Sequence, residues 1–151
     1  MDRSKILTSV IILLAIALGI YWIQSYQHRP QAMEFAGRTD HVDGNNIYTR
    51  GVYVNPKNVE TDKPIEADMV ISVDQNTKYI KVTQFLPTAA ELEASGGMYE
   101  PAKLKSEEGE GSLQDIADEV TDGIFAKSDR NIYGKAGFTA SEIKYYVRVQ
   151  P

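Results

Sequence analysis

An uncharged run over residues 6–23 constrains this chain more than any other feature of its sequence. A helix rises 1.5 Å per residue, so the run would extend roughly 27 Å, close to the hydrocarbon thickness of a bilayer. Tyr21, Trp22 and Tyr26 place aromatic rings at and just beyond its end, as is common at membrane interfaces. The sequence therefore predicts a transmembrane helix over residues 6–23, after a short tail of residues 1–5.

A cleaved secretory signal is the alternative for this segment, because Arg3 and Lys5 supply a positive start before the apolar run. A signal-peptidase site needs small residues followed by a polar mature end, whereas Gly19 is followed by the bulky residues 20–23. We therefore expect a retained anchor. The basic residues before the run slightly favour a cytoplasmic N-terminus, with the bulk of the chain outside the cytoplasmic membrane.

The rest of the chain reads as a connector of residues 24–32 and a single domain of residues 33–151. With 42% apolar and 25% charged residues, the composition is that of a folding chain. No cysteine is present, so disulfides, thiolate metal sites and cysteine nucleophiles are excluded. Beyond residue 28 the net charge is −6, which makes nucleic acid and anionic lipid poor partners for the domain.

The domain is predicted to be mainly β, because short runs rich in Val, Ile, Tyr and Thr alternate with turn residues. Six strands are expected, at residues 34–42, 46–54, 68–73, 77–86, about 119–126 and about 140–149. Asp43-Gly44-Asn45 and Asp74-Gln75-Asn76 have the composition of turns and predict two hairpins. In the last strand, Ile143 and Tyr145 alternate with polar neighbours, so this face is expected to cover a core.

Residues 87–111 interrupt the strand pattern. Thr88 with Glu91 three residues later is a helix N-cap signature and predicts one or two helical turns through Ala94. The acidic, glycine-rich stretch 106–111 is expected to be a mobile loop. A second short helical turn is predicted at Ser112–Asp115, with Leu113 and Ile116 spaced to contact the core on one side.

These elements fit a small OB-like antiparallel β-barrel of five to six strands with short helical inserts, and a split sandwich is the alternative. The phrases that carry a family resemblance are Gly37, Val42-Asp-Gly-Asn, Val70-Ile-Ser-Val-Asp-Gln-Asn-Thr-Lys, Leu113-Gln-Asp-Ile, Val120 and Phe138-Thr-Ala-Ser-Glu-Ile. Over about residues 35–149 the chain resembles a small OB-like domain family of bacterial envelope proteins whose function is unknown. The resemblance implies a β-barrel outside the membrane and carries over no functional residue.

Little in the sequence is typical of a catalytic or cofactor site. The oxygen-rich set Asp40, Asp43, Asn45 and Asn46 lacks the ligand spacing of a calcium loop, and turn chemistry explains it better. His28 and His41 are the two histidines, too few for a zinc site without distant carboxylates. Neither a nucleophile elbow nor a phosphate-binding loop is present. We expect no cofactor, no bound metal and no enzymatic activity.

Two surfaces are candidates for binding. Tyr48 and Arg50 are expected to share the outer face of one strand, and the last strand repeats the pattern with Tyr146 and Arg148. The acidic residues Glu107, Glu108 and Glu110 form a possible docking patch for a basic partner, or simply a solvated loop. Three functions follow: an interaction or assembly module in the envelope, a binding module for a cell-wall glycan or peptide, and, least favoured, an envelope enzyme.

Overall fold

The computed structural model describes residues 12, 14–22, 25, 29–61, 63–100, 104–118, 121 and 123–150. The chain divides into two compact units, Met1–Pro30 and Gln31–Pro151. In the first unit residues 14–22 are helical and exposed. Within the described residues, no helix has the length and apolarity needed to cross a membrane. The predicted tail of residues 1–5 and much of the predicted anchor, namely residues 6–11, 13 and 23, lie outside the described residues.

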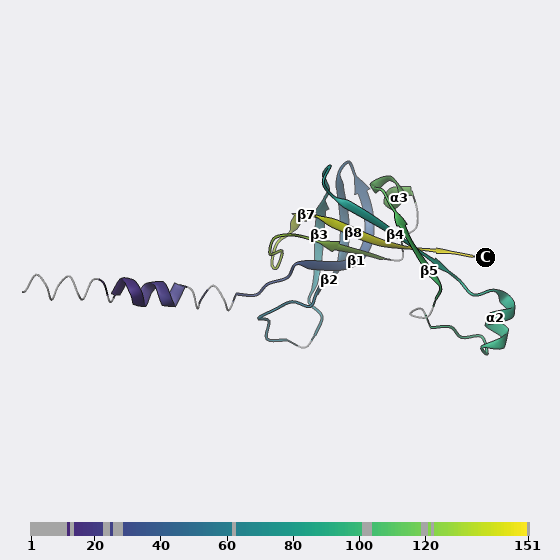
Figure 1. Ribbon diagram of the computed structural model, residues 1–151, viewed down its shortest axis with the longest axis horizontal. Helices are drawn as coiled ribbons and strands as arrows, with labels where there is room; N and C mark the ends of the chain where they lie inside the picture. Colours follow the sequence, from purple (N-terminus) through teal and green to yellow (C-terminus); the bar gives the residue numbers. More distant parts are fainter. Residues whose placement is uncertain are drawn as a thin grey trace, which may run out of the picture. The chain divides into compact units, whose positions relative to one another are not determined.

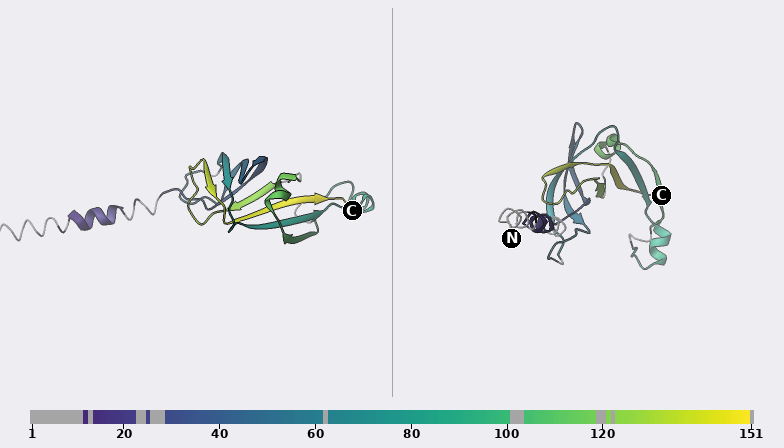
Figure 2. Two further views of the ribbon diagram at one scale, coloured as in Figure 1. Left: turned by 90° about the horizontal axis from the view of Figure 1, so that it is seen from above. Right: turned by 60° about the vertical axis from the view of Figure 1, so that its left-hand side comes forward.

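The second unit is mainly β, as predicted, and its described residues form one eight-stranded sheet with two short helices (Figure 1). The elements are β1 (Glu34–Asp43), β2 (Asn46–Val54), β3 (Glu66–Ser72), β4 (Lys78–Phe85), α2 (Ala89–Ala94), β5 (Ser106–Glu110), α3 (Leu113–Asp118), β6 (Gly123–Lys127), β7 (Gly137–Thr139) and β8 (Glu142–Val149). The hydrogen-bonded order is β5-β4-β8-β6-β1-β2-β3-β7. The sheet is strongly curved (Figure 2), and β5 and β7 are its two ends.

The first predicted hairpin is confirmed. β1 and β2 pair in antiparallel register from Glu34↔Val54 to Asp43↔Asn46, which leaves a two-residue loop. Gly44 has a φ of 55° in this loop, a conformation that glycine adopts without the steric cost of a side chain. Local sequence therefore determines this hairpin.

The second predicted hairpin is wrong. β3 pairs with β2 and β7, whereas β4 pairs with β8 and β5, so β3 and β4 do not pair with each other. The β3·β7 and β4·β8 pairs are parallel, which also corrects the expectation of a purely antiparallel barrel, and the order of the sheet is not closed. The buried Thr77 stabilises this arrangement, because its hydroxyl donates to the Ala140 carbonyl at 2.8 Å and connects the β3–β4 turn to the β7–β8 junction.

The predicted last strand is confirmed as β8, which begins two residues later than expected, whereas β7 (Gly137–Thr139) is an additional strand. One further expectation needs correction. The stretch 106–111, expected to be a mobile loop, instead contains β5, which pairs with β4 from Gln84↔Ser106 to Ile80↔Glu110. All five residues of β5 are exposed, so backbone pairing with β4 holds this strand rather than burial of its side chains.

The core lies on the inner face of the curved sheet. Its largest fully buried side chains are Tyr145, Phe35, Ile47, Met69, Ile71, Ile124, Ile132 and Ile143. The predicted contacts of the second helical turn are confirmed, since Ile116 of α3 is buried in this core and Leu113 packs against it. The inward face predicted for the last strand is confirmed as well, because Ile143 and Tyr145 are fully buried.

The other predicted helical turn is also confirmed. Thr88 caps α2 in a reciprocal arrangement: the Glu91 backbone N–H donates to the Thr88 hydroxyl, and the Glu91 carboxylate accepts from the Thr88 backbone. None of the α2 residues is buried. The helix lies beyond the paired strands, at the end of the excursion from β4 to β5 (Figure 1).

A group of hydrogen bonds connects α3 to Tyr145 of the core. The Tyr145 hydroxyl donates to the Asp115 carboxylate at 2.7 Å, and the same carboxylate accepts from the Ser112 backbone at 3.0 Å. The Asp115 backbone in turn donates to the Ser112 hydroxyl at 3.1 Å, which completes the N-terminal cap of α3. Tyr145, and to a smaller extent Ser112, lower the pKa of Asp115 below that of an ordinary aspartate.

Stability is therefore expected to depend on pH through Asp115. A carboxyl whose folded pKa is depressed stabilises the fold above its unfolded pKa, near 4, and this contribution is lost as pH falls through the folded pKa. We expect Asp115→Asn to cost about 1 kcal/mol at neutral pH and to reduce the loss of stability on acidification. Urea unfolding from pH 7 to pH 3 measures both effects; equal acid sensitivity of the two proteins would contradict the assignment.

Candidate functional site

The outer face of β1, β2 and β3 carries the first predicted pair of binding residues. Along β2 the residues Ile47 and Thr49 are buried, so Tyr48 and Arg50 between and after them point outward. The structure thus places Tyr48 and Arg50 on one face, as the alternation predicts. Tyr48 is half-buried and Arg50 is exposed.

A β-bulge adds His41 to this face. The register of β1 against β2 shifts between Thr39 and His41, which leaves Asp40 as the extra residue and turns His41 outward beside Tyr48. The rings of His41 and Tyr48 stack with centroids 4.2 Å apart and an interplanar angle of 8°. Asp40 holds the imidazole in place, since its carboxylate lies 3.0 Å from His41 Nδ1.

Two arginines lie next to this ring pair, directly opposite each other on β1 and β2. Arg50 Nε donates to Asp68 Oδ1 on β3 at 2.7 Å. This hydrogen bond raises the pKa of Arg50 and lowers the pKa of Asp68, so the two remain an ion pair across the neutral range. Arg38 is the register partner of Arg50, and within the described residues its side chain makes no hydrogen bond or ion pair.

These side chains surround an open hollow of about 720 Å³. Its outward-pointing lining is Arg38, Asp40, His41, Tyr48, Arg50, Asp68 and Val70. The two arginines and the two aspartates cancel in charge, and the ring pair gives the hollow a flat aromatic part. The hollow is therefore suited to a neutral ligand that offers both donors and acceptors and an apolar face.

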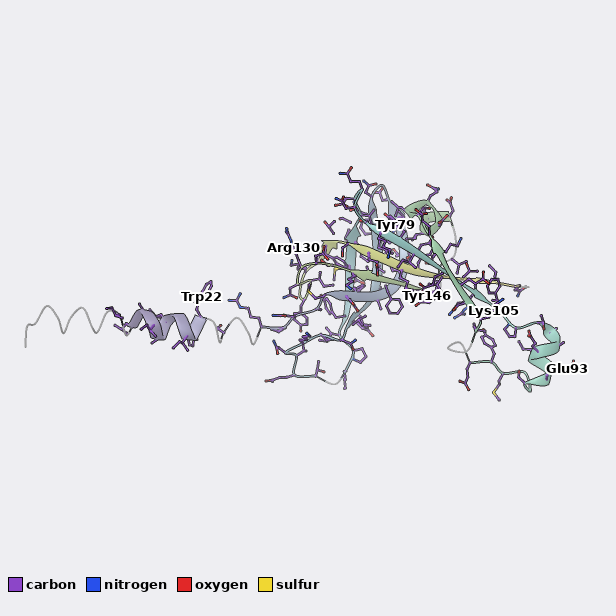
Figure 3. The ribbon with its side chains drawn as sticks, viewed as in Figure 1. Trp22, Tyr79, Glu93, Lys105, Arg130 and Tyr146 are labelled. Atoms are coloured by element: carbon purple, nitrogen blue, oxygen red, sulfur yellow. The ribbon has the colours of Figure 1, made fainter. Side chains whose placement is uncertain are left out.

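The second predicted pair lies elsewhere on the same face of the sheet. Tyr146 and Arg148 belong to β8, which is separated from β2 by β6 and β1, and neither lines the hollow. The position of Tyr146 is marked in Figure 3. Tyr146 packs edge-on against the exposed Phe125 of β6, with ring centroids 5.8 Å apart. The structure thus gives Tyr146 an aromatic neighbour of its own.

The predicted acidic patch is a strand edge rather than a loop. Glu107, Glu108 and Glu110 all belong to β5, at one end of the sheet. Two of the three are neutralised in part: Glu107 lies 3.7 Å from Lys105 Nζ, and Glu108 accepts a hydrogen bond from Lys144 of β8. Both ion pairs are solvent-exposed, so each contributes little to stability.

The polar residues around Asp43 behave as turn residues. Asp43 and Asn46 close the β1–β2 hairpin, and the Ser72 hydroxyl donates to Asn46 Oδ1 at 2.8 Å. In the part of the chain that the structure describes, no three His, Asp or Glu side chains gather as metal ligands. His28 lies outside the described residues.

Sequence reasoning did not place five residues of the hollow on a binding surface: Arg38, Asp40, His41, Asp68 and Val70. A strict alternation along β1 would place His41 on the inner face together with Phe35, and only the bulge reverses this. Asp68 is recognisable as a partner of Arg50 once the β2–β3 register is known, since the two are directly opposite. Comparisons of the chain with protein-family models, with curated proteins and with solved structures gave no match.

Proposed function

We propose that this chain is a non-enzymatic envelope protein, anchored by its N-terminal segment, whose OB-like domain binds a cell-wall glycan outside the cytoplasmic membrane. The hollow on β1, β2 and β3 is the observation that carries this proposal. The membrane anchor and the extracytoplasmic location rest on the apolar run of residues 6–23 and the basic residues before it.

The strand pairing supports an OB-like barrel that is partly open. Residues 66–85, which form β3 and β4, run parallel to residues 137–149, which form β7 and β8. β8 also pairs with β6, and β6 with β1. Counted in this way, five stretches of chain surround the core: β1, β2, β3 with β4, β6, and β7 with β8. Helix α3 precedes the fourth of them, β6. A partly open five-stranded barrel is typical of OB domains. In such barrels the second and third strands often bind oligosaccharides or oligonucleotides.

A glycan suits the hollow better than the other polymers. Sugar hydroxyls donate and accept hydrogen bonds, which matches arginine donors and aspartate acceptors lying side by side. The stacked rings of His41 and Tyr48 offer a flat surface for the apolar face of a sugar ring. Nucleic acid is disfavoured, because the domain is acidic and the charges of the hollow cancel.

The test is the affinity of the full-length chain, in detergent micelles, for oligosaccharides of N-acetylglucosamine, a neutral sugar of cell-wall glycan. We expect Tyr48→Ala to weaken binding by about 5- to 30-fold, equivalent to roughly 1–2 kcal/mol, because the stacking surface is lost. Tyr48→Phe retains the ring and is expected to retain most of the affinity.

Tyr99→Ala is the control, since Tyr99 is a solvent-exposed tyrosine that lies on the excursion between α2 and β5, outside the hollow. It is expected to bind as the wild type does. Equal affinities of the Tyr48→Ala and Tyr99→Ala proteins would sink the proposal. Cross-linking in intact membranes that captured one protein partner and no glycan would instead favour an assembly module.

A further inference from the structure

We propose that the glycan site continues from the hollow across β1 and β6 to Tyr146, so that the domain binds a linear glycan lying across its strands. This inference rests on the proposed function. It unites two side-chain groups on adjoining parts of the sheet, the hollow on β1, β2 and β3 and the aromatic pair on β6 and β8.

The strand registers place the two groups in one row. Arg50 of β2 is opposite Arg38 of β1. Gly37 of β1 is opposite Ile124 of β6, and the two strands are antiparallel. The next residue of β1, Arg38, therefore lies alongside the preceding residue of β6, Gly123. Gly123 in turn is opposite Tyr146 of β8.

All members of this row face outward. Ile124 and Ala126 of β6 are buried, so Gly123 and Phe125 alternate onto the outer side. Tyr145 is buried in the core, and Tyr146 therefore faces the opposite way. Neighbouring strands are about 4.8 Å apart, so the row from β2 to β8 measures roughly 14 Å along the curved sheet.

Gly123 keeps the row open at its middle. The strand alternation calls for a side chain here, between Arg38 and Tyr146, and glycine supplies none. No backbone constraint requires glycine at this position: its φ is not positive, and a Cβ would meet only the Gly37 carbonyl at 3.5 Å, an ordinary contact. The missing side chain thus lacks a structural explanation, whereas an extended ligand lying across β6 needs this gap.

The far end of the row offers a second aromatic surface. Phe125 is 45% exposed and packs edge-on against Tyr146. Lys144, which is opposite Phe125, is paired, since its ammonium group donates to Glu108. A neutral chain of sugar rings could stack at both ends, whereas an anionic chain would gain no unpaired cation beyond Arg38 among the described residues along this row.

The experiment measures the affinity of the full-length chain for N-acetylglucosamine oligosaccharides of increasing length, which carry the sugar of cell-wall glycan without its carboxylates. We expect the affinity to rise with length and then to level off once the oligosaccharide spans the row. Gly123→Ile is expected to weaken binding of long oligosaccharides by about tenfold and to leave short ones unaffected, because a rigid side chain lifts the ligand from β6. Tyr146→Ala should have the same length-dependent effect.

Gly109→Ile is the matched control, since Gly109 of β5 also has open space around it and lies away from the row. It is expected to bind long oligosaccharides as the wild type does. Wild-type affinity of Gly123→Ile for every length, with Tyr48→Ala still impaired, would overturn the extended site and leave the hollow as the whole site. Failure of the wild type to bind any length would overturn the proposed function itself.

Discussion

The Gly51→Val protein is expected to lose about 3 kcal/mol or more of its free energy of unfolding, among the largest losses for any single change in the domain. A Cβ at Gly51 would lie 2.0 Å from the Ala36 carbonyl oxygen and 2.4 Å from the Gly37 Cα. Both atoms belong to the backbone of β1, so no side-chain rotation relieves the overlap. β1 would have to move away from β2, which would also displace Arg38 and the bulge at Asp40.

The measurement is urea unfolding of the full-length chain, followed by the circular dichroism of the sheet. Gly109→Val is the matched control, because a Cβ at Gly109 meets nothing within 4 Å. That variant is expected to unfold close to the wild-type midpoint. Equal unfolding midpoints of the two valine variants would show that the fold does not require close packing of β1 against β2 at Gly51.

Tyr145→Ala is the second change with a large expected effect, a loss of about 3–5 kcal/mol. Tyr145 is fully buried on β8, so truncation leaves a cavity in the core and removes the hydrogen bond to Asp115. Its ring also covers Gly111, where a Cβ would come within 2.5 Å of the hydroxyl. The packing of the sheet, of α3 and of the end of β5 therefore depends on the Tyr145 side chain.

The next residue provides the control for this prediction. Tyr146→Ala makes the same chemical change on the same strand, but on the outer face, and is expected to cost about 1 kcal/mol or less. Thermal unfolding of the two variants compares the faces directly. A larger loss for Tyr146→Ala than for Tyr145→Ala would mean that the two faces of β8 have been assigned the wrong way round.

The parts of the fold that sequence predicts are those determined by local contacts. The β1–β2 hairpin follows from a strand alternation and a Gly-Asn turn, and the caps of α2 and α3 follow from side chains three residues apart. The parallel partners of β3 and β4 could not be predicted, because they come from residues 137–149, far along the chain. β5 was missed since its acidic residues bury nothing and carry no periodic signal.

The residues of the candidate site likewise fall into those that local sequence predicts and those that only the structure identifies. Tyr48 and Arg50 share a face because residues two apart on a strand always do, and this needs no tertiary information. His41 joins them only through the bulge at Asp40, which no local pattern predicts. The separation of Tyr48 from Tyr146 depends on the order of four strands, which again only the structure provides.

The parallel pairing of residues 66–85 with residues 137–149 also determines when the domain can fold. Contacts between such distant stretches carry a large loop-closure cost and are typical of slowly folding proteins. Until β8 has been synthesised, β4 lacks its parallel neighbour and β6 lacks one of its two partners. If the domain is exported as proposed, the complete sheet can assemble only after β8 has crossed the membrane, so we expect full resistance to protease to arise late, after export of the last strand.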